Sequence, residues 1–182
     1  MFVSPAKIIE DLGVGPSMTV ADFGCGSGHY SIEAAKKVGK SGKVFAIDIQ
    51  QDMLGFVRTR AKTEDLTNIE TIWTDLETPD STRLASGTVD LVFISNILFQ
   101  AEDKNKIIQE AFRILKSGGR VSIIEWDIES QIDKLGPPMD SRISKDTAKS
   151  LLESAGFVFK KEFNPGDHHY GFVFRKLEKQ GA

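Results

Sequence analysis

A chain of 182 residues, 40% of them hydrophobic, is long enough to bury one core without disulfides or metal ions, so we expect a single domain over residues 1–182. The net charge of −3 excludes the broadly basic surface typical of duplex-binding proteins, and we expect no nucleic acid partner. No segment approaches the ~18 apolar residues of a membrane span, and the N-terminus lacks a signal-peptide pattern. With a lone cysteine, Cys25, these features predict a cytoplasmic protein.

Apolar segments of strand length alternate with segments of helical period along the chain. The expected elements are, in order, a short helix within residues 1–17, a strand at 18–23, a helix from 30 to 38, a strand at 43–47, a helix around 53–61, strands at 69–73 and 89–94, a helix at 107–115 ended by Gly118-Gly119, a strand at 120–126, a helix at 148–155, and strands at 157–163 and 169–175.

This alternation predicts an α/β fold, in which a doubly wound and mostly parallel sheet carries helices on both faces. The least regular stretch is 128–143, which contains Gly136-Pro137-Pro138. Proline and glycine interrupt regular structure, so we expect a lid-like insert there, between a strand and a helix.

A glycine-rich segment follows the first strand, at the edge where a parallel sheet binds its ligands. Glycines at positions 24, 26 and 28 precede a helix whose N-terminal amides carry partial positive charge. Asp48 follows the second strand, where a carboxylate can accept hydrogen bonds from both hydroxyls of a ribose. Together these features predict a nucleotide site. In a simpler interpretation, the glycines only make a tight turn and Asp48 only caps the next helix.

The glycine spacing differs from that of two common nucleotide-binding loops. A G-x-G-x-x-G dinucleotide loop that began at Gly24 would need a third glycine at position 29, where the chain has His29. Counted from Gly26, the third place is Ser31, and no G-K-S/T sequence follows. The spacing therefore argues against a nicotinamide-dependent reductase and against a P-loop enzyme.

Residues 20–30, VADFGCGSGHY, resemble the first motif of class I S-adenosylmethionine-dependent methyltransferases, most closely the small ubiquinone/menaquinone-biosynthesis-like (type 11) group. The resemblance covers residues 20–126, through FAIDIQ, TDLE, DLVFISNILF and AFRILKSGGRVSIIEW, and SRISKDTAKSLLESAGF extends it. It implies a Rossmann-like, seven-stranded sheet, mostly parallel with the last strand antiparallel. It also implies S-adenosyl-L-methionine as cofactor, S-adenosyl-L-homocysteine as product, and no metal ion.

The same resemblance implies roles around the cofactor. Asp22 would hold the glycine loop or the amino group of the cofactor, and Asp48 would bind the ribose hydroxyls. Asp75 would accept a hydrogen bond from the adenine, against which Ile49 and Met53 would pack. The predicted cofactor-binding set is Asp22, Gly24, Cys25, Gly26, Gly28, Asp48, Ile49, Met53, Thr74, Asp75, Leu76, Ser95, Asn96 and Phe99, of which Ser95 and Asn96 would face the methionine end.

Departures from neighbouring families restrict the methyl acceptor. Enzymes that methylate amino nitrogens of DNA bases or of protein glutamine often carry (Asn/Asp)-Pro-Pro-aromatic after the fourth strand, where this chain reads SNIL. Metal-dependent catechol methyltransferases need acidic ligands, and Asp90 lies at the wrong end of its strand. Arsenite methyltransferases need several cysteines, and this chain has Cys25 alone. We therefore expect a small-molecule acceptor, bound by a monomer or a homodimer.

Three residues are the predicted catalytic candidates. His168 and His169 precede the last strand, and one of them is the predicted proton acceptor, because histidine titrates near neutral pH. A solvent-exposed turn is the simpler interpretation of this pair. Tyr30 follows the glycine segment, where an aromatic ring can stabilise a positive sulfonium.

Three acids at the end of the fifth strand, Glu125, Asp127 and Glu129, either face a cationic acceptor or form a solvated surface. Our prediction is thus an S-adenosylmethionine-dependent methyltransferase (EC 2.1.1.-) that acts on a small molecule by direct methyl transfer. The alternatives are an RNA methyltransferase, which the lack of basic tracts disfavours, and a nucleotide-binding protein of this fold without turnover.

Overall fold

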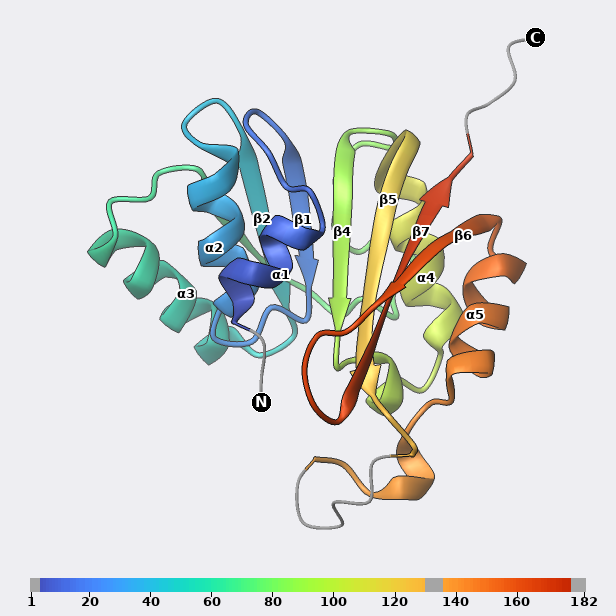
Figure 1. Cartoon of the computed structure of the whole chain (residues 1–182). Helices are drawn as coiled ribbons and strands as arrows, with labels where there is room; N and C mark the ends of the chain where they lie inside the picture. Colours follow the sequence, from blue (N-terminus) through green and yellow to red (C-terminus); the bar gives the residue numbers. More distant parts are fainter. Residues whose placement is uncertain (1–3, 130–135, 178–182) are drawn as a thin grey trace, which may run out of the picture.

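The computed structural model describes residues 4–129 and 136–177, and places seven strands in one twisted sheet between two groups of helices (Figure 1). No helix in these two stretches is long and apolar enough to cross a membrane. The elements are α1 (Pro5–Asp11), β1 (Thr19–Phe23), α2 (His29–Val38), β2 (Lys43–Asp48), α3 (Gln51–Thr63), β3 (Ile69–Trp73), β4 (Val89–Ser95), η1 (Leu98–Gln100), α4 (Lys104–Ile114), β5 (Leu115–Trp126), η2 (Met139–Ser141), α5 (Lys145–Ser154), β6 (Phe157–Phe163) and β7 (His169–Lys176).

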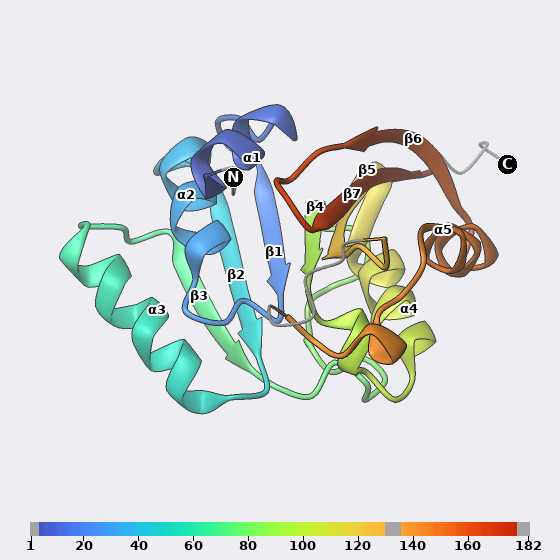
Figure 2. The ribbon, with the colours of Figure 1, turned by 60° about the horizontal axis from the view of Figure 1, so that its bottom comes forward.

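The strand order, β3-β2-β1-β4-β5-β7-β6, confirms the predicted doubly wound fold. β1 pairs in parallel with both β2 and β4, so the direction of winding reverses between β1 and β4. β7 runs antiparallel to both of its neighbours, β5 and β6. In open sheets of this kind, ligands bind beyond the carboxyl ends of the strands at such a switch point. This edge is brought forward in Figure 2.

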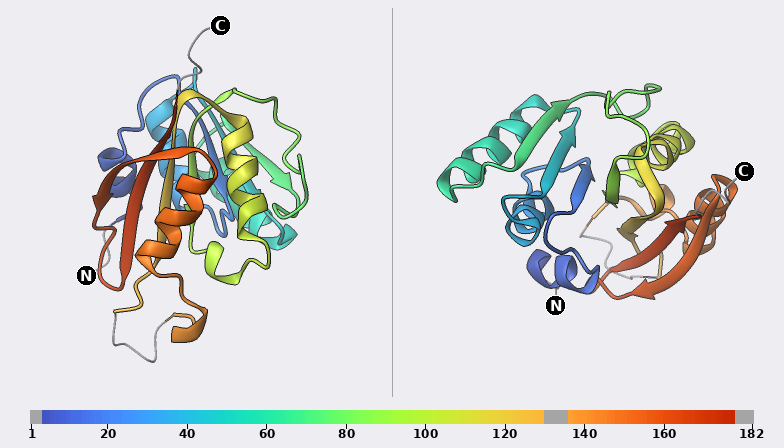
Figure 3. Two further views of the ribbon diagram at one scale, coloured as in Figure 1. Left: turned by 90° about the vertical axis from the view of Figure 1, so that its right-hand side faces the viewer. Right: turned by 90° about the horizontal axis from the view of Figure 1, so that it is seen from above.

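The two faces of the sheet carry separate cores, because alternate residues of a strand point to opposite faces. On one face, Val20 and Phe93 pack with residues of α1 and α2, such as Ile9. On the other face, Ala21 and Val92 pack with residues of α4 and α5. Figure 3 shows α1–α3 on one side of the sheet and α4–α5 on the other. The strands of the centre are buried on both sides, which is why their sequences are almost continuously apolar.

The end of α4 differs from the prediction. The helix stops at Ile114 and β5 begins at Leu115, so Gly118-Gly119 do not end the helix but lie within the strand. Pairing with β4 shifts register between Leu115 and Arg120, as in a bulge. Gly118 has φ +75°, and a Cβ on Gly119 would lie 2.9 Å from the Lys116 carbonyl oxygen. The two glycines therefore allow a bulge within the strand. The sequence pattern alone does not distinguish such a bulge from the end of a helix.

The flanks of the predicted insert at 128–143 are tied to the carboxyl end of β5, while residues 130–135 lie outside the described part of the chain. Arg142 is buried and donates hydrogen bonds to the carbonyls of Asp127 (3.0 Å) and Pro137 (3.1 Å). The Arg142 guanidinium also lies over the Trp126 ring, 5.5 Å from its centroid. On the described residues, the insert thus begins and ends beside Trp126.

Candidate functional site

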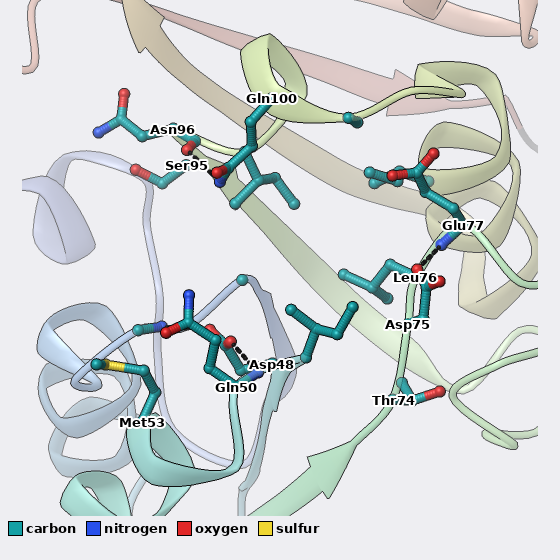
Figure 4. A pocket seen from close by; sticks show the side chains of 16 residues that line it. Asp48, Gln50, Met53, Thr74, Asp75, Leu76, Glu77, Ser95, Asn96 and Gln100 are labelled. Atoms are coloured by element: carbon teal, nitrogen blue, oxygen red, sulfur yellow. Dashed lines mark hydrogen bonds between the residues drawn. The ribbon is translucent and has the colours of Figure 1, made fainter. Parts of the chain in front are cut away.

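A cavity of about 480 Å³ lies at the carboxyl edge of the sheet, at the switch point between β1 and β4 (Figure 4). Its volume is within the range of about 300–1,000 Å³ usual for small-molecule and cofactor sites. The loops after β1, β2, β3 and β4 all contribute to its walls. The lining residues are Gly24, Gly26, Asp48, Ile49, Gln50, Met53, Thr74, Asp75, Leu76, Glu77, Ser95, Asn96, Ile97, Gln100, Ala101 and Ile107.

Asp48 connects the glycine loop to the start of α3. Its Oδ2 accepts a hydrogen bond from the Gly26 N–H and its Oδ1 accepts one from the Gln50 N–H, both at 2.8 Å. The residue is only 7% exposed, yet it lines the cavity. A carboxylate oxygen can accept more than one hydrogen bond, so both oxygens keep acceptor capacity for a ligand. Asp48 therefore holds the backbone of Gln50, the residue before α3, and shapes the loop beside the cavity. It is not the helix cap of the simpler interpretation, because the N-cap of α3 is Gln50, whose own side chain makes no capping hydrogen bond.

All three glycines of the loop have positive φ: +67° at Gly24, +51° at Gly26 and +81° at Gly28. Residues other than glycine adopt positive φ at a cost in free energy. A Cβ on Gly24 would overlap the Cγ2 of Ile97, and a Cβ on Gly28 would lie 2.8 Å from the Cγ2 of Val57. A Cβ on Gly26 would meet no atom within 4 Å. Gly24 and Gly28 are thus needed for close packing, whereas Gly26 needs glycine for its backbone conformation alone.

Asp22 is buried behind the glycine loop and does not line the cavity. Its Oδ2 accepts a hydrogen bond of 2.6 Å from the Ser31 hydroxyl, at the start of α2. Burial raises the pKa of the Asp22 carboxyl from 3.8 to about 6, and the Ser31 hydrogen bonds oppose the rise. Of the two roles predicted for Asp22, holding the loop is the one that these contacts support.

Three other residues predicted to contact the cofactor do not line the cavity either. Cys25 is buried and packs with α3, and Gly28 packs against Val57. Phe99 is partly buried against the core next to α4. Their assignment to the cofactor stays a prediction, and their contacts in the structure are with the protein's own interior.

Ser95 and Asn96 lie across the cavity from Asp48 and Met53 (Figure 4). The Ser95 side chain lies near the Tyr30 hydroxyl and acts to lower its pKa, and the Tyr30 ring stacks on Phe93 at 5.8 Å between centroids. Burial raises the pKa of the Tyr30 hydroxyl, so this group stays protonated at neutral pH. The structure thus brings Tyr30 to one side of the same site.

Asn96 has a left-handed backbone conformation, with φ +55°. Its N–H donates to the Ile124 carbonyl at 2.8 Å, which joins the end of β4 to β5. Its Oδ1 is buried and has no hydrogen-bond partner among the described residues. A buried acceptor without a partner costs free energy, and a ligand with a donor group at this position would remove that cost.

His168 and His169 line a second cavity, of about 460 Å³, between the β6–β7 turn and the start of α5. The two cavities share no lining residue. The His169 ring lies against Trp126, with 4.1 Å between ring centroids. Burial lowers the pKa of His169 from 6.5 to about 4, and the nearby His168 and Arg142 add to the shift. The structure therefore does not bring the histidine pair into the first cavity, and its catalytic role stays a prediction.

We expect the free energy of unfolding to decrease between pH 6.5 and pH 4 because of His169. Its pKa is lower in the folded chain than in the unfolded chain, so its contribution is complete above about pH 6.5 and is lost as the pH falls through about 4. Urea unfolding at pH 7.0 and 4.5 measures the decrease. The variant His169→Phe keeps a ring against Trp126 but cannot titrate, so its decrease should be smaller. An equal decrease in both proteins would contradict the assignment to His169.

The three acids at the end of β5 do not form one acidic surface. Glu125 is fully buried, Asp127 is partly buried and Glu129 is exposed. Burial raises the pKa of the Glu125 carboxyl from 4.5 to about 7, while backbone N–H groups of residues 97–99 oppose the rise. The prediction that all three face an acceptor or solvent is wrong for Glu125, because β5 is a central strand whose residues are covered on both faces.

Six residues that line the first cavity were not predicted: Gln50, Glu77, Ile97, Gln100, Ala101 and Ile107. For two of them the sequence carries a signal, since each follows a strand-end acid by two positions. The N–H groups of Gln50 and Glu77 bond the carboxylates of Asp48 and Asp75, both at 2.8 Å. The other four lie in or near η1 and α4, where no local pattern indicates which side faces the cavity.

A glycine loop with positive φ at the switch point, with a carboxylate at the end of the neighbouring strand, is an arrangement by which proteins of the Rossmann-like class bind nucleosides. A model of the family described as "Methyltransferase domain" matches residues 15–162, most of the chain. The chain therefore belongs to the methyltransferase-domain family, and the resemblance to class I, type 11 methyltransferases is confirmed.

Several known proteins are similar to this chain. A demethylmenaquinone methyltransferase of Lactococcus lactis is 32% identical over 66% of the chain and 46% of its own length. An arsenite methyltransferase of Halobacterium salinarum is 26% identical over 87% of the chain and 41% of its own length. The crystal structure of a SAM-dependent methyltransferase from Aquifex aeolicus superposes with a TM-score of 0.86 at 28% identity, covering 97% of this chain and 90% of that one. The chain thus spans less than half of the first two relatives.

Proposed function

We propose that the chain binds S-adenosyl-L-methionine in the first cavity and transfers its methyl group to a small-molecule acceptor. The observation that carries the proposal is the Asp48 carboxylate, which lines the cavity and holds the N–H of Gly26 at 2.8 Å. A carboxylate that can accept hydrogen bonds from ribose hydroxyls and a glycine loop on the adjacent strand end together support the proposal. Membership of the methyltransferase-domain family supplies the cofactor that such a site would take.

The residues of the cavity fit the parts of this cofactor. Ile49 is 61% exposed, and its carbonyl accepts a hydrogen bond of 2.9 Å from the Trp73 indole. An adenine ring that packed on Ile49 and Met53 would cover this apolar surface. Asp75 lies at the same side of the cavity as an acceptor for the adenine amino group. At the other side, the unpaired Oδ1 of Asn96 suits the amino group of the methionine part.

The bound cofactor would supply a methyl group already activated on a sulfonium. When bound, this sulfonium would give its methyl group to an electron pair of the acceptor, its sulfur would keep the electrons of the broken bond, and a proton would leave the acceptor if its nucleophilic atom carried one. The main task of the protein is then to align the acceptor with the methyl group, which in ideal cases lowers the activation barrier by about 7–11 kcal/mol. If a proton must leave, His168 or His169 is the proposed acceptor of that proton, and Tyr30 the proposed neighbour of the sulfonium.

An organic acceptor, such as a quinol or a phenol, fits this chain better than arsenite does. The two named relatives act on demethylmenaquinone and on arsenite, according to their names. Arsenite binding needs thiolates, whereas Cys25 is buried in the glycine loop and burial raises the pKa of its thiol well above its usual range. No group of three histidine, cysteine or acidic residues that could hold a metal ion occurs in residues 4–129 and 136–177.

We expect both S-adenosylmethionine and S-adenosylhomocysteine to bind the purified chain, with one site per chain in titration calorimetry. Labelled S-adenosylmethionine should then transfer its methyl group to a member of a panel of quinols, phenols, amines, thiols and RNA, with small organic acceptors preferred. No binding of either compound at millimolar concentration would overturn the cofactor assignment. Binding with transfer to RNA alone would overturn the small-molecule assignment. Binding without transfer to any acceptor would favour a binding protein of this fold.

A further inference from the structure

Glu125 is a fully buried carboxyl that the proposed reaction does not use. It is the last but one residue of β5, has no exposed surface, and is paired with Tyr170 of the antiparallel β7. Acidic side chains are rarely buried without partners, because the loss of hydration is costly. The contacts that Glu125 makes are therefore informative about its role.

The carboxyl of Glu125 holds the backbone that follows β4. Its Oε1 accepts a hydrogen bond of 2.8 Å from the Leu98 N–H, and the N–H groups of Ile97 and Phe99 also stabilise its ionised form. Its Oε2 has no hydrogen-bond partner among the described residues. Lys104, at the start of α4, is the cation that favours the ionised form. The carboxyl thus reaches from β5 to the first amides of η1.

This stretch of backbone forms one wall of the first cavity. Ile97, Gln100 and Ala101 line the cavity, and the Cγ2 of Ile97 occupies the space that a Cβ on Gly24 would need. A shift of the turn would therefore move Ile97 relative to the glycine loop. The same turn is tied to β5 at its other end, where the Asn96 N–H donates to the Ile124 carbonyl.

We propose that Glu125 is a positioning residue of the cofactor cavity, which fixes Ile97 against the glycine loop by holding the Leu98 N–H from the neighbouring strand. The proposal rests on the proposed function, because the cavity is taken to bind S-adenosylmethionine and its product. It assigns to Glu125 a role in ligand affinity beyond its contribution to folding. A carboxyl is suited to this role because η1 is too short to satisfy its own first amides, and no strand in the described part of the chain pairs with them.

Three substitutions separate positioning from folding. Glu125→Gln keeps an oxygen acceptor for the Leu98 N–H, so affinity for S-adenosylhomocysteine should stay within about threefold of the unchanged chain. Glu125→Leu keeps the approximate volume and removes the acceptor, and should weaken binding about tenfold or more, as loss of a buried hydrogen bond to a charged group predicts. Glu125→Asp keeps the acid but is one methylene shorter, so it cannot reach Leu98 without a shift of the turn, and should also weaken binding. If Glu125→Leu does not fold, Glu125→Asp takes its place as the test of positioning.

Glu110→Gln is the matched control. Glu110 is likewise buried, at 4% exposed, and accepts hydrogen bonds from Thr82 and Arg113, but neither of these partners lies in a wall of the first cavity. Its substitution should lower the urea midpoint and leave the affinity for S-adenosylhomocysteine unchanged. The control therefore shows whether loss of a buried carboxylate, and the stability that goes with it, is enough to weaken binding.

Calorimetry with S-adenosylhomocysteine and hydrogen exchange of the Leu98 amide test the proposal together. The expected result is faster exchange at Leu98 and weaker binding in Glu125→Leu and Glu125→Asp, with both properties restored in Glu125→Gln. Wild-type affinity in the Leu or Asp variant would overturn the positioning role while leaving the proposed function intact. Equal loss of affinity in Glu110→Gln would also overturn it. Failure of the unchanged chain to bind would overturn the proposed function, and the positioning role with it.

Discussion

Replacement of Gly24 by alanine is expected to weaken binding of S-adenosylhomocysteine by roughly a hundredfold or more, which corresponds to about 2.7 kcal/mol. Two effects combine at this position. The residue has φ +67°, which costs an L-residue about 1–2 kcal/mol, and the added Cβ would overlap the Cγ2 of Ile97. The overlap can be relieved only by displacement of the loop or of the opposite wall, both of which line the cavity. Calorimetric titration measures the loss.

Two further variants separate the two effects. Gly26 also has a positive φ, of +51°, but a Cβ there would meet no atom within 4 Å, so Gly26→Ala should show the backbone cost alone. The double variant Gly24→Ala/Ile97→Ala removes the overlapping methyl group and should recover part of the affinity. Near wild-type binding by Gly24→Ala would contradict the close approach of the glycine loop to Ile97. No recovery in the double variant would contradict the overlap as the main cause.

The fold could be predicted from the sequence because local and global signals agree. The strands of the sheet's centre are buried on both faces and therefore read as apolar runs, as at Val89–Ser95, and turn glycines separate them from amphipathic helices. The error at Gly118-Gly119 has a physical origin. A glycine with positive φ fits the end of a helix and a bulge within a strand equally well, and only the register of β4 against β5 decides between them.

The part of the first cavity that the strand ends form could be predicted for a related reason. Every carboxyl end of a parallel strand lies at one edge, so Asp48 and Asp75 are brought together by topology, without knowledge of side-chain packing. The walls formed by η1 and α4 could not be predicted, because a single turn of 3-10 helix has no periodic pattern. The burial of Glu125 could not be predicted for a different reason: two further acids, Asp127 and Glu129, follow it closely in the sequence, but its carboxyl contacts a backbone amide of the turn after β4.

The place of the histidine pair depends on contacts between distant parts of the chain. His169 was predicted from residue type and from its place before the last strand, and it does lie at the carboxyl edge, against Trp126. Whether such a histidine shares a cavity with the glycine loop depends on how the β6–β7 turn folds back, and the sequence carries no signal for this. The structure places it in a separate cavity.

The variant Asp48→Ala is expected to weaken binding of S-adenosylhomocysteine by roughly 1–3 kcal/mol, or about 5–150-fold. The substitution removes both oxygens that hold the N–H groups of Gly26 and Gln50, and it removes the acceptor proposed for the ribose hydroxyls. Asp48→Asn keeps one oxygen acceptor, so its affinity should lie between those of Asp48→Ala and the unchanged chain. Asp52→Ala, at an exposed position in the first turn of α3, is the control for loss of a carboxylate and should bind normally. Unchanged affinity in Asp48→Ala would mean that Asp48 only holds the backbone at Gly26 and Gln50 and does not contribute to binding.

Weaker binding alone would not show whether Asp48 contacts the ribose or only shapes the loop, because the substitution removes the carboxylate on which both roles depend. A double-mutant cycle with a 2′-deoxyribose analogue of S-adenosylhomocysteine distinguishes them. If Asp48 bonds the 2′-hydroxyl, loss of that hydroxyl should cost the unchanged chain about tenfold in affinity and should cost Asp48→Ala almost nothing. If Asp48 acts through the Gly26 backbone alone, the two losses should add, and the analogue should be weakened equally in both proteins. Additive losses would therefore show that Asp48 does not contact the ribose, and that it acts only by holding the glycine loop.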